Sequence, residues 1–303
     1  MNNASMTSIL YGRPPAVFDP PADAVQTSPL IPGSADLAEM TAGSLDAATI
    51  LAPPGVLERR YVLALALKAL KPGGRLDVMA PKQKGGSRLG KELREFGLEP
   101  IESAKAHHRR CELVRPEAVA GLDAASEAGA PRLVPGLDAW SQPGVFGWDR
   151  IDGGTALLAA SLPPLKGAGA DLGCGFGALS TVVLASAAVT TLDMIDLDRR
   201  AVDCARRNVE DPRVRLHWAD ARAVDITDLN FVVMNPPFHD GGAEDKALGQ
   251  AFIRKASAML KKGGALWMVA NRHLPYEAEL KAAFARVRPV ADKGGYKVFE
   301  AVK

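Results

Sequence analysis

Short apolar runs alternate with stretches of helical character through the second half of the chain. Residues 198–209 and 246–262 place their apolar side chains on one helical face, which predicts amphipathic helices. A third helix is expected at 178–187, after a glycine-rich turn. Strands are expected at 168–171, 189–195, 214–218, 231–234 and 265–270. Strands that alternate with helices indicate an α/β fold with a mostly parallel, doubly wound sheet.

The first half of the chain contains an echo of the second. Residues 70–81 align with 260–271, and six of the twelve positions are identical. Upstream of each, residues 50–55 echo 233–238 around a Pro-Pro pair. Helix, Gly-Gly and strand also recur by chance in α/β proteins, but the shared order favours a duplicated unit. The second copy is seven residues longer after Pro-Pro, and the natural place for the addition is the polar loop 239–245.

Composition fits two globular domains. Of the 303 residues, 47% are hydrophobic and 24% are charged, which excludes a disordered chain, a collagen-like chain and a small disulfide scaffold. Residues 116–143 are rich in Ala, Gly and Pro and are predicted to be a linker. The expected domains are therefore 1–135 and 136–303. We find no apolar run long enough to span a membrane and no signal peptide at the N-terminus.

The cysteines indicate a cellular location, whereas the net charge does not identify a binding partner. The net charge is +2, from 37 basic and 35 acidic residues, and each half of the chain carries about +1. Nucleic acid is therefore neither indicated nor excluded as a partner. The three cysteines, Cys111, Cys174 and Cys204, are widely spaced without a C-x-x-C motif. Reduced thiols and a cytoplasmic location are expected.

A glycine-rich turn follows the first predicted strand of the second domain. Asp171-Leu172-Gly173-Cys174-Gly175-Phe176-Gly177 has the strand–turn–helix context of a nucleotide site, although its spacing is G-x-G-x-G. Asp196 ends the next strand, where a carboxylate binds ribose hydroxyls, and Asp193 is its rival within that strand. Asp220 ends the third strand and is expected to accept from an adenine amine. Each of these two strand-end aspartates could instead cap a helix, but the series favours an adenosine ligand.

Asn235-Pro236-Pro237-Phe238 follows the fourth predicted strand. The prolines force a rigid turn at the carboxyl edge of the sheet, where ligands bind in such folds. The Asn235 side-chain oxygen and the Pro236 carbonyl can both accept hydrogen bonds from one NH₂ group, which leaves the nitrogen lone pair aimed at an electrophile. Phe238 can stack on a planar base. The alternative is a structural turn with a core phenylalanine.

Together these features resemble a class I S-adenosylmethionine-dependent methyltransferase that acts on nitrogen. More narrowly, the chain resembles the C-type family of small-subunit ribosomal RNA guanine-N2 methyltransferases. The residues that carry this likeness are Pro143-Gly144-Val145-Phe146, Asp152-Gly153-Gly154, Asn235 to Gly241, Val269-Ala270-Asn271 and Leu274-Pro275-Tyr276. The resemblance implies two Rossmann-like methyltransferase domains in tandem, with mostly parallel seven-stranded sheets and helices on both faces. The first domain is then degenerate and lacks a cofactor site.

The resemblance also assigns roles. S-adenosylmethionine is the expected cofactor, and Asn235, Pro236, Pro237 and Phe238 are the expected catalytic residues. The expected substrate contacts are Phe146, Asp152, Phe238 and His239. The expected cofactor contacts are Asp171, Gly173, Cys174, Gly175, Gly177, Asp196, Leu197, Asp220, Ala221 and Asn235.

Other functions remain open from the sequence. The same Asn-Pro-Pro-aromatic motif serves methyl transfer to adenine N6 and to protein glutamine amides. An NAD-dependent oxidoreductase is disfavoured by the missing third glycine, and a non-catalytic RNA-binding scaffold suits only the first half. We expect no metal site, because the five histidines lack ligand spacing, and no His/Asp couple is evident. The expected partner is ribosomal RNA or a ribosomal subunit, with a monomeric protein and no membrane.

Overall fold

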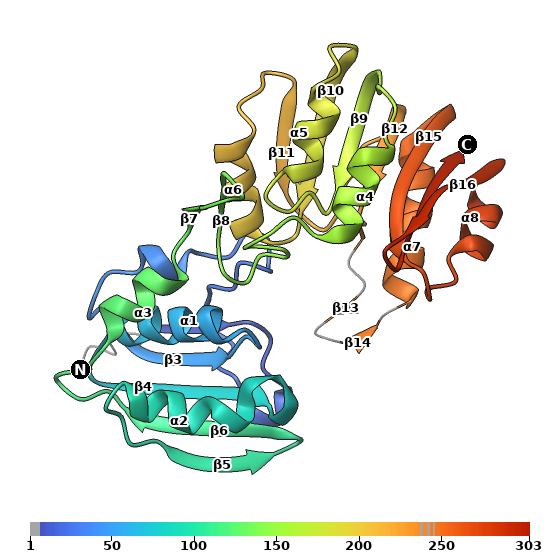
Figure 1. Cartoon of the computed structure of the whole chain (residues 1–303). Helices are drawn as coiled ribbons and strands as arrows, with labels where there is room; N and C mark the ends of the chain where they lie inside the picture. The colour runs from blue at the N-terminus through green and yellow to red at the C-terminus, as the bar shows by residue number, and fades with distance from the viewer. Residues whose placement is uncertain (1–6, 237–238, 241–242, 245) are drawn as a thin grey trace. The chain divides into compact units, whose positions relative to one another are not determined.

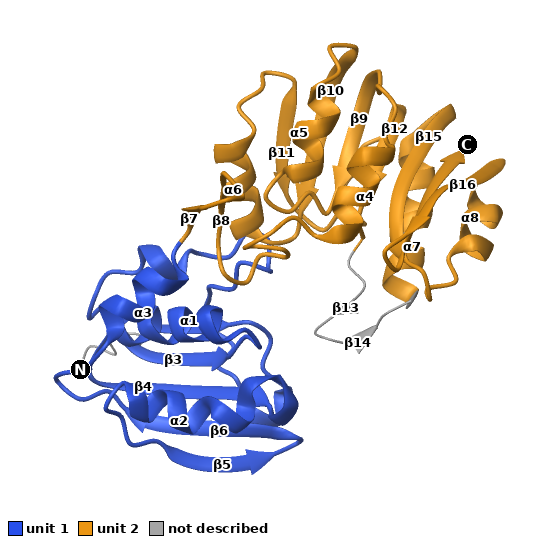
Figure 2. Cartoon of the chain, in the orientation of Figure 1, with its two compact units in different colours: residues 1–130 blue, residues 131–303 orange. Residues whose placement is uncertain are grey.

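The computed structural model describes residues 7–236, 239–240, 243–244 and 246–303. The chain divides into two compact units, residues 1–130 and 131–303, shown in blue and orange in Figure 2. Each unit is built on a mixed, mostly parallel sheet, so the predicted α/β class with two Rossmann-like sheets is confirmed (Figure 1). No helix within the described ranges is long and apolar enough to cross a membrane.

Unit 1 has a six-stranded sheet in the order β2-β1-β3-β4-β6-β5, whereas seven strands were expected. β6 and β5 run antiparallel to their neighbours, and the other pairs are parallel. The elements are β1 (Ser8–Tyr11), β2 (Val25–Gln26), β3 (Leu45–Leu51), α1 (Val56–Ala69), β4 (Leu70–Pro81), α2 (Ser87–Glu95), β5 (Ile101–Lys105), β6 (His108–Val114) and α3 (Leu122–Gly129). Among the described residues of this unit, short helical turns at Ala16–Phe18, Leu37–Glu39 and Lys82–Gly86 complete the elements.

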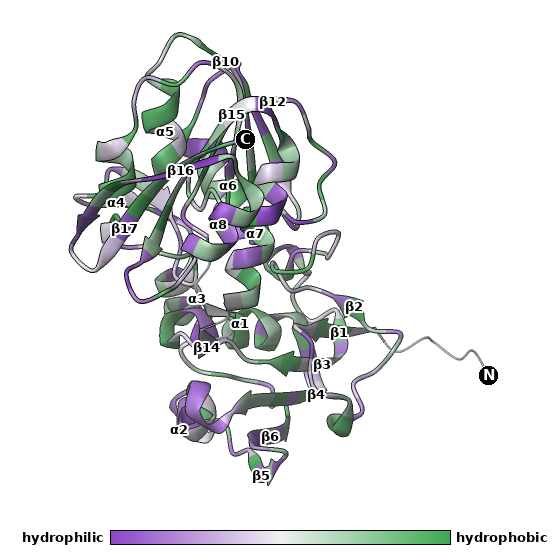
Figure 3. Cartoon of the chain, turned by 90° about the vertical axis from the view of Figure 1, so that its right-hand side faces the viewer, coloured by the Kyte–Doolittle hydropathy of each residue, from purple (hydrophilic) through white to green (hydrophobic). Residues whose placement is uncertain are grey.

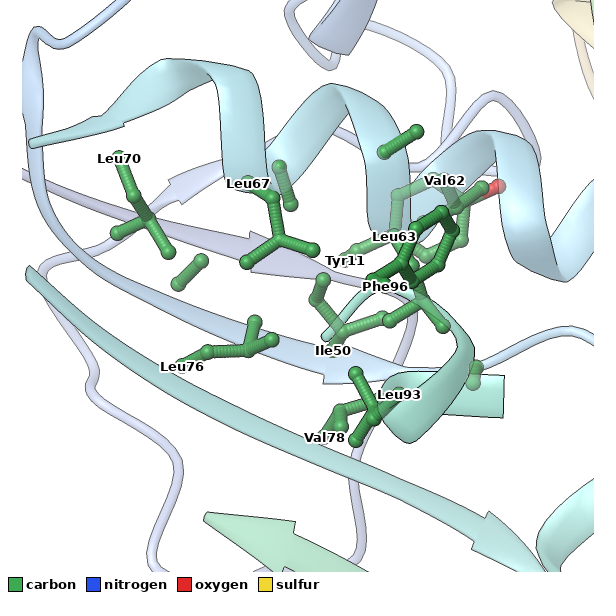
Figure 4. Close-up of a cluster of buried hydrophobic side chains, with 14 of the residues drawn as sticks. Tyr11, Ile50, Val62, Leu63, Leu67, Leu70, Leu76, Val78, Leu93 and Phe96 are labelled. Atoms are coloured by element: carbon green, nitrogen blue, oxygen red, sulfur yellow. The ribbon is translucent and has the colours of Figure 1, made fainter. Parts of the chain in front are cut away.

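The core of unit 1 lies between the sheet and the helices α1 and α2. Figure 4 shows Leu63 and Leu67 of α1 and Leu93 of α2 packed over Ile50 and Val78 of the central strands. All five side chains are fully buried, which is the main source of stability for such a layer. The opposite side of α2 is polar and exposed, and Figure 3 shows this helix largely in purple.

The prediction of a linker at residues 116–143 was wrong. This segment contains α3 and the hairpin of β7 (Arg132–Val134) with β8 (Ala139–Ser141). The small side chains of α3 gave no clear apolar period, yet Leu122 and Ala125 are buried in the unit 1 core. A Cβ at Gly129 would lie 2.3 Å from the Cβ of Tyr61, so glycine allows α3 to approach α1 closely. The contacts therefore divide the units at residue 130, just before this hairpin.

Unit 2 has a seven-stranded sheet in the order β11-β10-β9-β12-β15-β17-β16, in which the last two strands are antiparallel to their neighbours. Its elements after β8 are α4 (Gly153–Ser161), β9 (Gly167–Leu172), α5 (Ala178–Leu184), β10 (Val189–Asp196), α6 (Arg199–Asn208), β11 (Val214–Trp218), β12 (Leu229–Met234), β13 (His239–Asp240), β14 (Ala243–Glu244), α7 (Lys246–Met259), β15 (Leu260–Asn271), α8 (Glu277–Ala283), β16 (Arg286–Lys293) and β17 (Tyr296–Val302).

Helices cover both faces of the second sheet. Along β12, Val232 and Met234 pack into the cluster that holds the apolar side chains of α7 and α8. Phe231 and Val233 alternate with them and pack into the cluster formed with α4, α5 and α6. This sandwich presents the carboxyl ends of β9, β10 and β12 at one edge.

The sequence echo corresponds to the same backbone turn in both units. Gly73 and Gly263 adopt φ values of +81° and +78°, which glycine accepts without strain. The Gly73 amide donates to the Arg115 carbonyl at 2.8 Å, and the Gly263 amide donates to the Lys303 carbonyl at 2.8 Å. In both units the register with the preceding parallel strand shifts at this turn. The turn begins β15 at Leu260, so the helix expected at 246–262 ends at Met259.

Candidate active site

The glycine-rich turn leaves β9 and opens α5, as predicted. Gly173, Gly175 and Gly177 all have positive φ. A Cβ at Gly177 would lie 2.8 Å from Val209 Cγ2, so this position also needs glycine for packing. The amides of Gly173 and Cys174 donate to the Ile195 carbonyl at 2.8 and 3.1 Å, which fixes the turn against the end of β10.

Asp196 is tied to the glycine-rich turn. Its Oδ2 accepts from the Gly175 amide at 2.8 Å and its Oδ1 accepts from the Asp198 amide at 2.8 Å. The N-cap of α6 is Asp198, so the alternative capping role falls on that residue and not on Asp196. Burial raises the pKa of Asp196 to about 6, against the hydrogen bonds from these amides. A carboxylate at this strand end retains lone pairs for further hydrogen-bond donors.

Asp171 is the second acidic group at this edge. It is fully buried, and its Oδ2 accepts from the Ser180 hydroxyl at 2.6 Å. Burial, with a smaller contribution from the Asp196 charge, raises the pKa of Asp171 to about 7. Two neighbouring carboxyl groups with raised pKa values are typical of functional sites.

Asp193 and Asp220 each pair with basic side chains. Asp193 is buried and pairs with Arg215 at 2.7 Å and with His217 Nε2 at 2.7 Å. The expectation that the chain has no His/Asp couple was therefore wrong, because strand pairing of β10 with β11 joins residues distant in sequence. Asp220 accepts from Arg222 at 2.7 Å, and this hydrogen bond lowers the pKa of Asp220.

Asn235 is held by residues from a different part of unit 2. Its Nδ2 donates to Asp152 Oδ2 at 3.1 Å and to Thr155 Oγ1 at 2.9 Å. The Asn235 Oδ1 atom is buried and accepts no hydrogen bond from the residues that the structure describes. An unsatisfied buried acceptor costs about 1–3 kcal/mol, so its presence at a cleft points to a ligand that donates to it. The sequence predicted an acceptor role for this oxygen.

A cleft joins the glycine-rich turn to Asn235. Of the predicted site residues, Asp171, Gly173, Cys174, Gly175, Phe146, Asp152 and Asn235 line it. Gly177, Asp196, Leu197, Asp220, Ala221 and Pro236 do not line it, although Asp196 is bonded to its wall through Gly175. Pro237, Phe238 and the side chain of His239 lie outside the described residues, so their predicted roles stay predictions.

Sequence reasoning missed Thr155, Arg150, Ile151 and Tyr296. Thr155 follows the Asp152-Gly153-Gly154 segment directly, so that motif could have pointed to it. Tyr296 lies on β17 and donates to Asp152 Oδ1 at 3.3 Å, a contact that only the folded sheet creates. No group of His, Cys, Asp and Glu in the described part of the chain could hold a metal ion.

Comparison with known proteins gives the family of the chain. Residues 136–300 match the methyltransferase small domain family. A ribosomal RNA small subunit methyltransferase C from Shewanella piezotolerans is 30% identical over 249 residues, which cover 80% of this chain and 73% of that protein. The protein of that name from Aeromonas hydrophila is 30% identical over 262 residues, covering 84% of this chain and 76% of its own.

A solved structure shares the whole architecture. It is a 16S rRNA N2 methyltransferase from T. thermophilus, in complex with AdoMet and guanosine. The TM-score is 0.78, and the match covers 98% of this chain and 88% of that one, at 23% identity. Fold, cleft and family match together define a Rossmann-like methyltransferase. More narrowly, the chain belongs to the ribosomal RNA small subunit methyltransferase C family, which confirms the predicted family.

Proposed function

We propose that this chain transfers a methyl group from S-adenosylmethionine to the exocyclic N2 of a guanine in small-subunit ribosomal RNA. The observation that carries the proposal is the buried Oδ1 of Asn235, a residue that lines the cleft, which has no hydrogen-bond partner among the described residues. An exocyclic amine is a hydrogen-bond donor, so it supplies what this atom lacks. The curated relatives are named for ribosomal RNA, and the T. thermophilus enzyme was solved with AdoMet and guanosine.

The residues at the carboxyl edge fit the cofactor. The backbone of Gly173 and Gly175 has no Cβ to keep a ligand away, and Asp196 has lone pairs left to accept from ribose hydroxyls. When bound, the cofactor supplies an electrophilic methyl group on a sulfonium. The assignments of Leu197, Asp220 and Ala221 to its adenine end stay predictions.

The proposed reaction is an in-line displacement. Asn235 Oδ1 and the Pro236 carbonyl each accept one N–H of the amine, which aims the nitrogen lone pair at the methyl group. The N–CH₃ bond forms as the S–CH₃ bond breaks, and the amine proton leaves to water. A strong base is unnecessary, because the amine becomes acidic only as it is alkylated. Alignment of this kind can lower a barrier by roughly 7–11 kcal/mol.

The target base must reach the cleft edge-on. A guanine within a helix has to be unstacked first, so an unpaired or partly assembled RNA is the expected substrate. Phe146 is 67% exposed at the mouth of the cleft and offers a face on which such a base can stack. A ribosomal RNA substrate would place the reaction in the cytoplasm, and the monomeric state stays a prediction.

The test is methyl transfer with labelled S-adenosylmethionine. The purified chain is incubated separately with undermodified 16S rRNA, assembled small subunits, tRNA and a protein pool, followed by mass spectrometry of nucleosides and amino acids. The proposal predicts label in N2-methylguanosine from 16S rRNA or its subunit. Label in N6-methyladenosine or in glutamine would assign the site to a different amine and overturn the guanine assignment.

A further inference from the structure

The amide of Asn235 has its orientation set by α4. A carboxamide has an oxygen and a nitrogen of nearly equal size, so packing alone does not decide which of them faces the cleft. Here the NH₂ group faces two acceptors, Asp152 Oδ2 at 3.1 Å and Thr155 Oγ1 at 2.9 Å. Reversing the amide would place its oxygen against the Asp152 carboxylate, where neither atom can donate. The Asp152 carboxylate therefore fixes the orientation of the amide, with Oδ1 on the side away from Asp152, and Thr155 Oγ1 is a second acceptor for the NH₂ group.

Asp152 is itself held rigidly. It is the N-cap of α4, and its Oδ2 accepts from the Gly154 amide at 2.9 Å and the Thr155 amide at 3.1 Å. Its Oδ1 accepts from the Tyr296 hydroxyl at 3.3 Å. A Cβ at Gly154 would lie 2.9 Å from the Tyr296 ring, so the glycine allows the strand residue to reach the cap. Burial and the Asp152 charge raise the pKa of Tyr296, which keeps its hydroxyl protonated as a donor.

We infer that Asp152 and Thr155 are positioning residues of the amine site: Asp152 fixes which end of the Asn235 amide is free, Thr155 holds the NH₂ group in place, and Tyr296 holds Asp152. In this orientation Oδ1 selects a ligand atom that donates N–H and rejects a ring nitrogen or carbonyl oxygen, which would meet another acceptor. This gives Asp152 a different task from the substrate contact that the sequence suggested. The inference rests on the proposed function, because it describes how the same Asn235 recognises its amine.

The test compares Thr155→Val with Thr155→Ser. Valine keeps the shape but removes one of the two acceptors, whereas serine keeps the hydroxyl. We expect Thr155→Val to lower the single-turnover rate of methyl transfer by about tenfold to a hundredfold, as small misplacements at a reacting group do. Affinity for S-adenosylmethionine should stay within about twofold, and Thr155→Ser should restore most of the rate. Thr190→Val, on an exposed position of β10, is the matched control and should change neither quantity.

A second readout does not depend on catalysis. The Asn235 side-chain NH₂ signal in a ¹⁵N spectrum, assigned by its loss in Asn235→Ala, should move in Thr155→Val and return in Thr155→Ser. Tyr296→Phe, which keeps the ring over Gly154, should move it less. An unchanged rate and signal in Thr155→Val would overturn the inference. So would a rate loss matched by equal losses of cofactor affinity and melting temperature, which would indicate a structural role only. If the wild type methylates no guanine but the signal still follows Thr155, the proposed function fails and the positioning role stands.

Discussion

The two units differ in whether the hydrogen-bond acceptors beside their Pro-Pro pairs have partners. In unit 1, Arg59 of α1 donates to the carbonyls of Pro53 and Pro54 at 3.0 and 2.8 Å and forms a bidentate pair with Glu92 of α2 at 2.7 and 2.6 Å. The Arg59 side chain is fully buried. In unit 2, Asn235 precedes the prolines, and its buried Oδ1 has no hydrogen-bond partner among the described residues. The acceptors beside the prolines of unit 1 are satisfied internally, whereas Asn235 lines a cleft with an acceptor left over.

The first turns of α1 in unit 1 and of α7 in unit 2 are also packed differently. In unit 1, the guanidinium of Arg59 occupies the place of a side chain at Gly85, where a Cβ would lie 2.2 Å from an arginine nitrogen. In unit 2, Gly249 of α7 leaves room for Tyr276, whose hydroxyl would lie 2.0 Å from a Cβ at 249. In unit 1 the large side chain, Arg59, is on the helix and faces a glycine. In unit 2 the glycine is on the helix, and the large side chain, Tyr276, faces it.

The other difference is on the cofactor side of the sheet. In unit 2, α5 connects β9 to β10 and α6 connects β10 to β11, which precedes β12. In unit 1, residues 12–44 connect the corresponding strands β1, β2 and β3 with only two short helical turns among the described residues. A glycine-rich turn that opens a helix N-terminus is what binds a nucleotide in this fold. We therefore propose that unit 1 keeps the scaffold without a cofactor site.

The largest expected effect comes from Asn235→Ala. Removing the Oδ1 acceptor should lower methyl transfer by at least about a hundredfold, comparable to the loss of one preorganised polar group at a reacting centre. Affinity for S-adenosylmethionine should be nearly unchanged. Single-turnover assays and calorimetry measure the two quantities. Transfer at the wild-type rate would remove Asn235 from the mechanism and make the two Pro-Pro turns functionally alike.

The next effect concerns the stability of unit 1. Arg59→Met leaves Glu92 buried without its partner, which should cost about 3–5 kcal/mol. Hydrogen exchange of the β3 and β4 amides reports this unit specifically. Arg60→Met on the same helix removes a partly exposed pair with Glu95 and should cost far less. If the two variants are equally stable, Arg59 does not hold the turn as its contacts suggest.

A smaller effect is expected from pH. Ribose hydroxyls need an ionised Asp196 as acceptor, and its pKa is raised to about 6. Affinity for S-adenosylmethionine should therefore fall by about tenfold from pH 7 to pH 5. Calorimetry across this range measures it, and Asp196→Asn should flatten the dependence. A wild-type affinity independent of pH would move the ribose contact to another residue.

The stability of unit 2 should rise as the pH falls, in the direction opposite to its affinity for S-adenosylmethionine. The folded-state pKa values of Asp171 and Asp196 lie above the ordinary value of the unfolded chain. The fold therefore favours their protonated forms, and this contribution is present at low pH. It is lost as the pH rises through about 6 and 7. Exchange of the β9 and β10 amides should report a more stable unit 2 near pH 5 than above pH 7, and the reverse order would contradict this expectation.

The smallest effect tests the shared turn. Gly73→Ala and Gly263→Ala add a Cβ with no atom within 4 Å, so only backbone strain remains. Each should cost about 1 kcal/mol, and the two costs should be equal. Amide exchange in β4 and β15 measures them separately. A much larger cost in one unit would show that the two turns differ energetically despite their common geometry.

Sequence patterns predicted the parts of this molecule that depend on local chemistry. The five parallel strands of unit 2, the turn around Gly173 and the place of Asn235 follow from apolar runs, glycine and proline, whereas β16 and β17 were not predicted. The α3 helix was missed because small residues such as Ala125 are buried without an apolar period. The links from Asn235 to Thr155 and from Asp152 to Tyr296 depend on strand order, which brings β12, β17 and the start of α4 together. No spacing along the chain encodes those contacts.

The central claim is that unit 2 binds the cofactor and unit 1 does not. Calorimetric titration of the whole chain with S-adenosylmethionine tests it most directly, using wild type and Asp196→Ala. The account predicts one cofactor per chain in the wild type and markedly weakened binding in Asp196→Ala. Two cofactors per chain, or a single cofactor that binds Asp196→Ala as tightly as wild type, would contradict it.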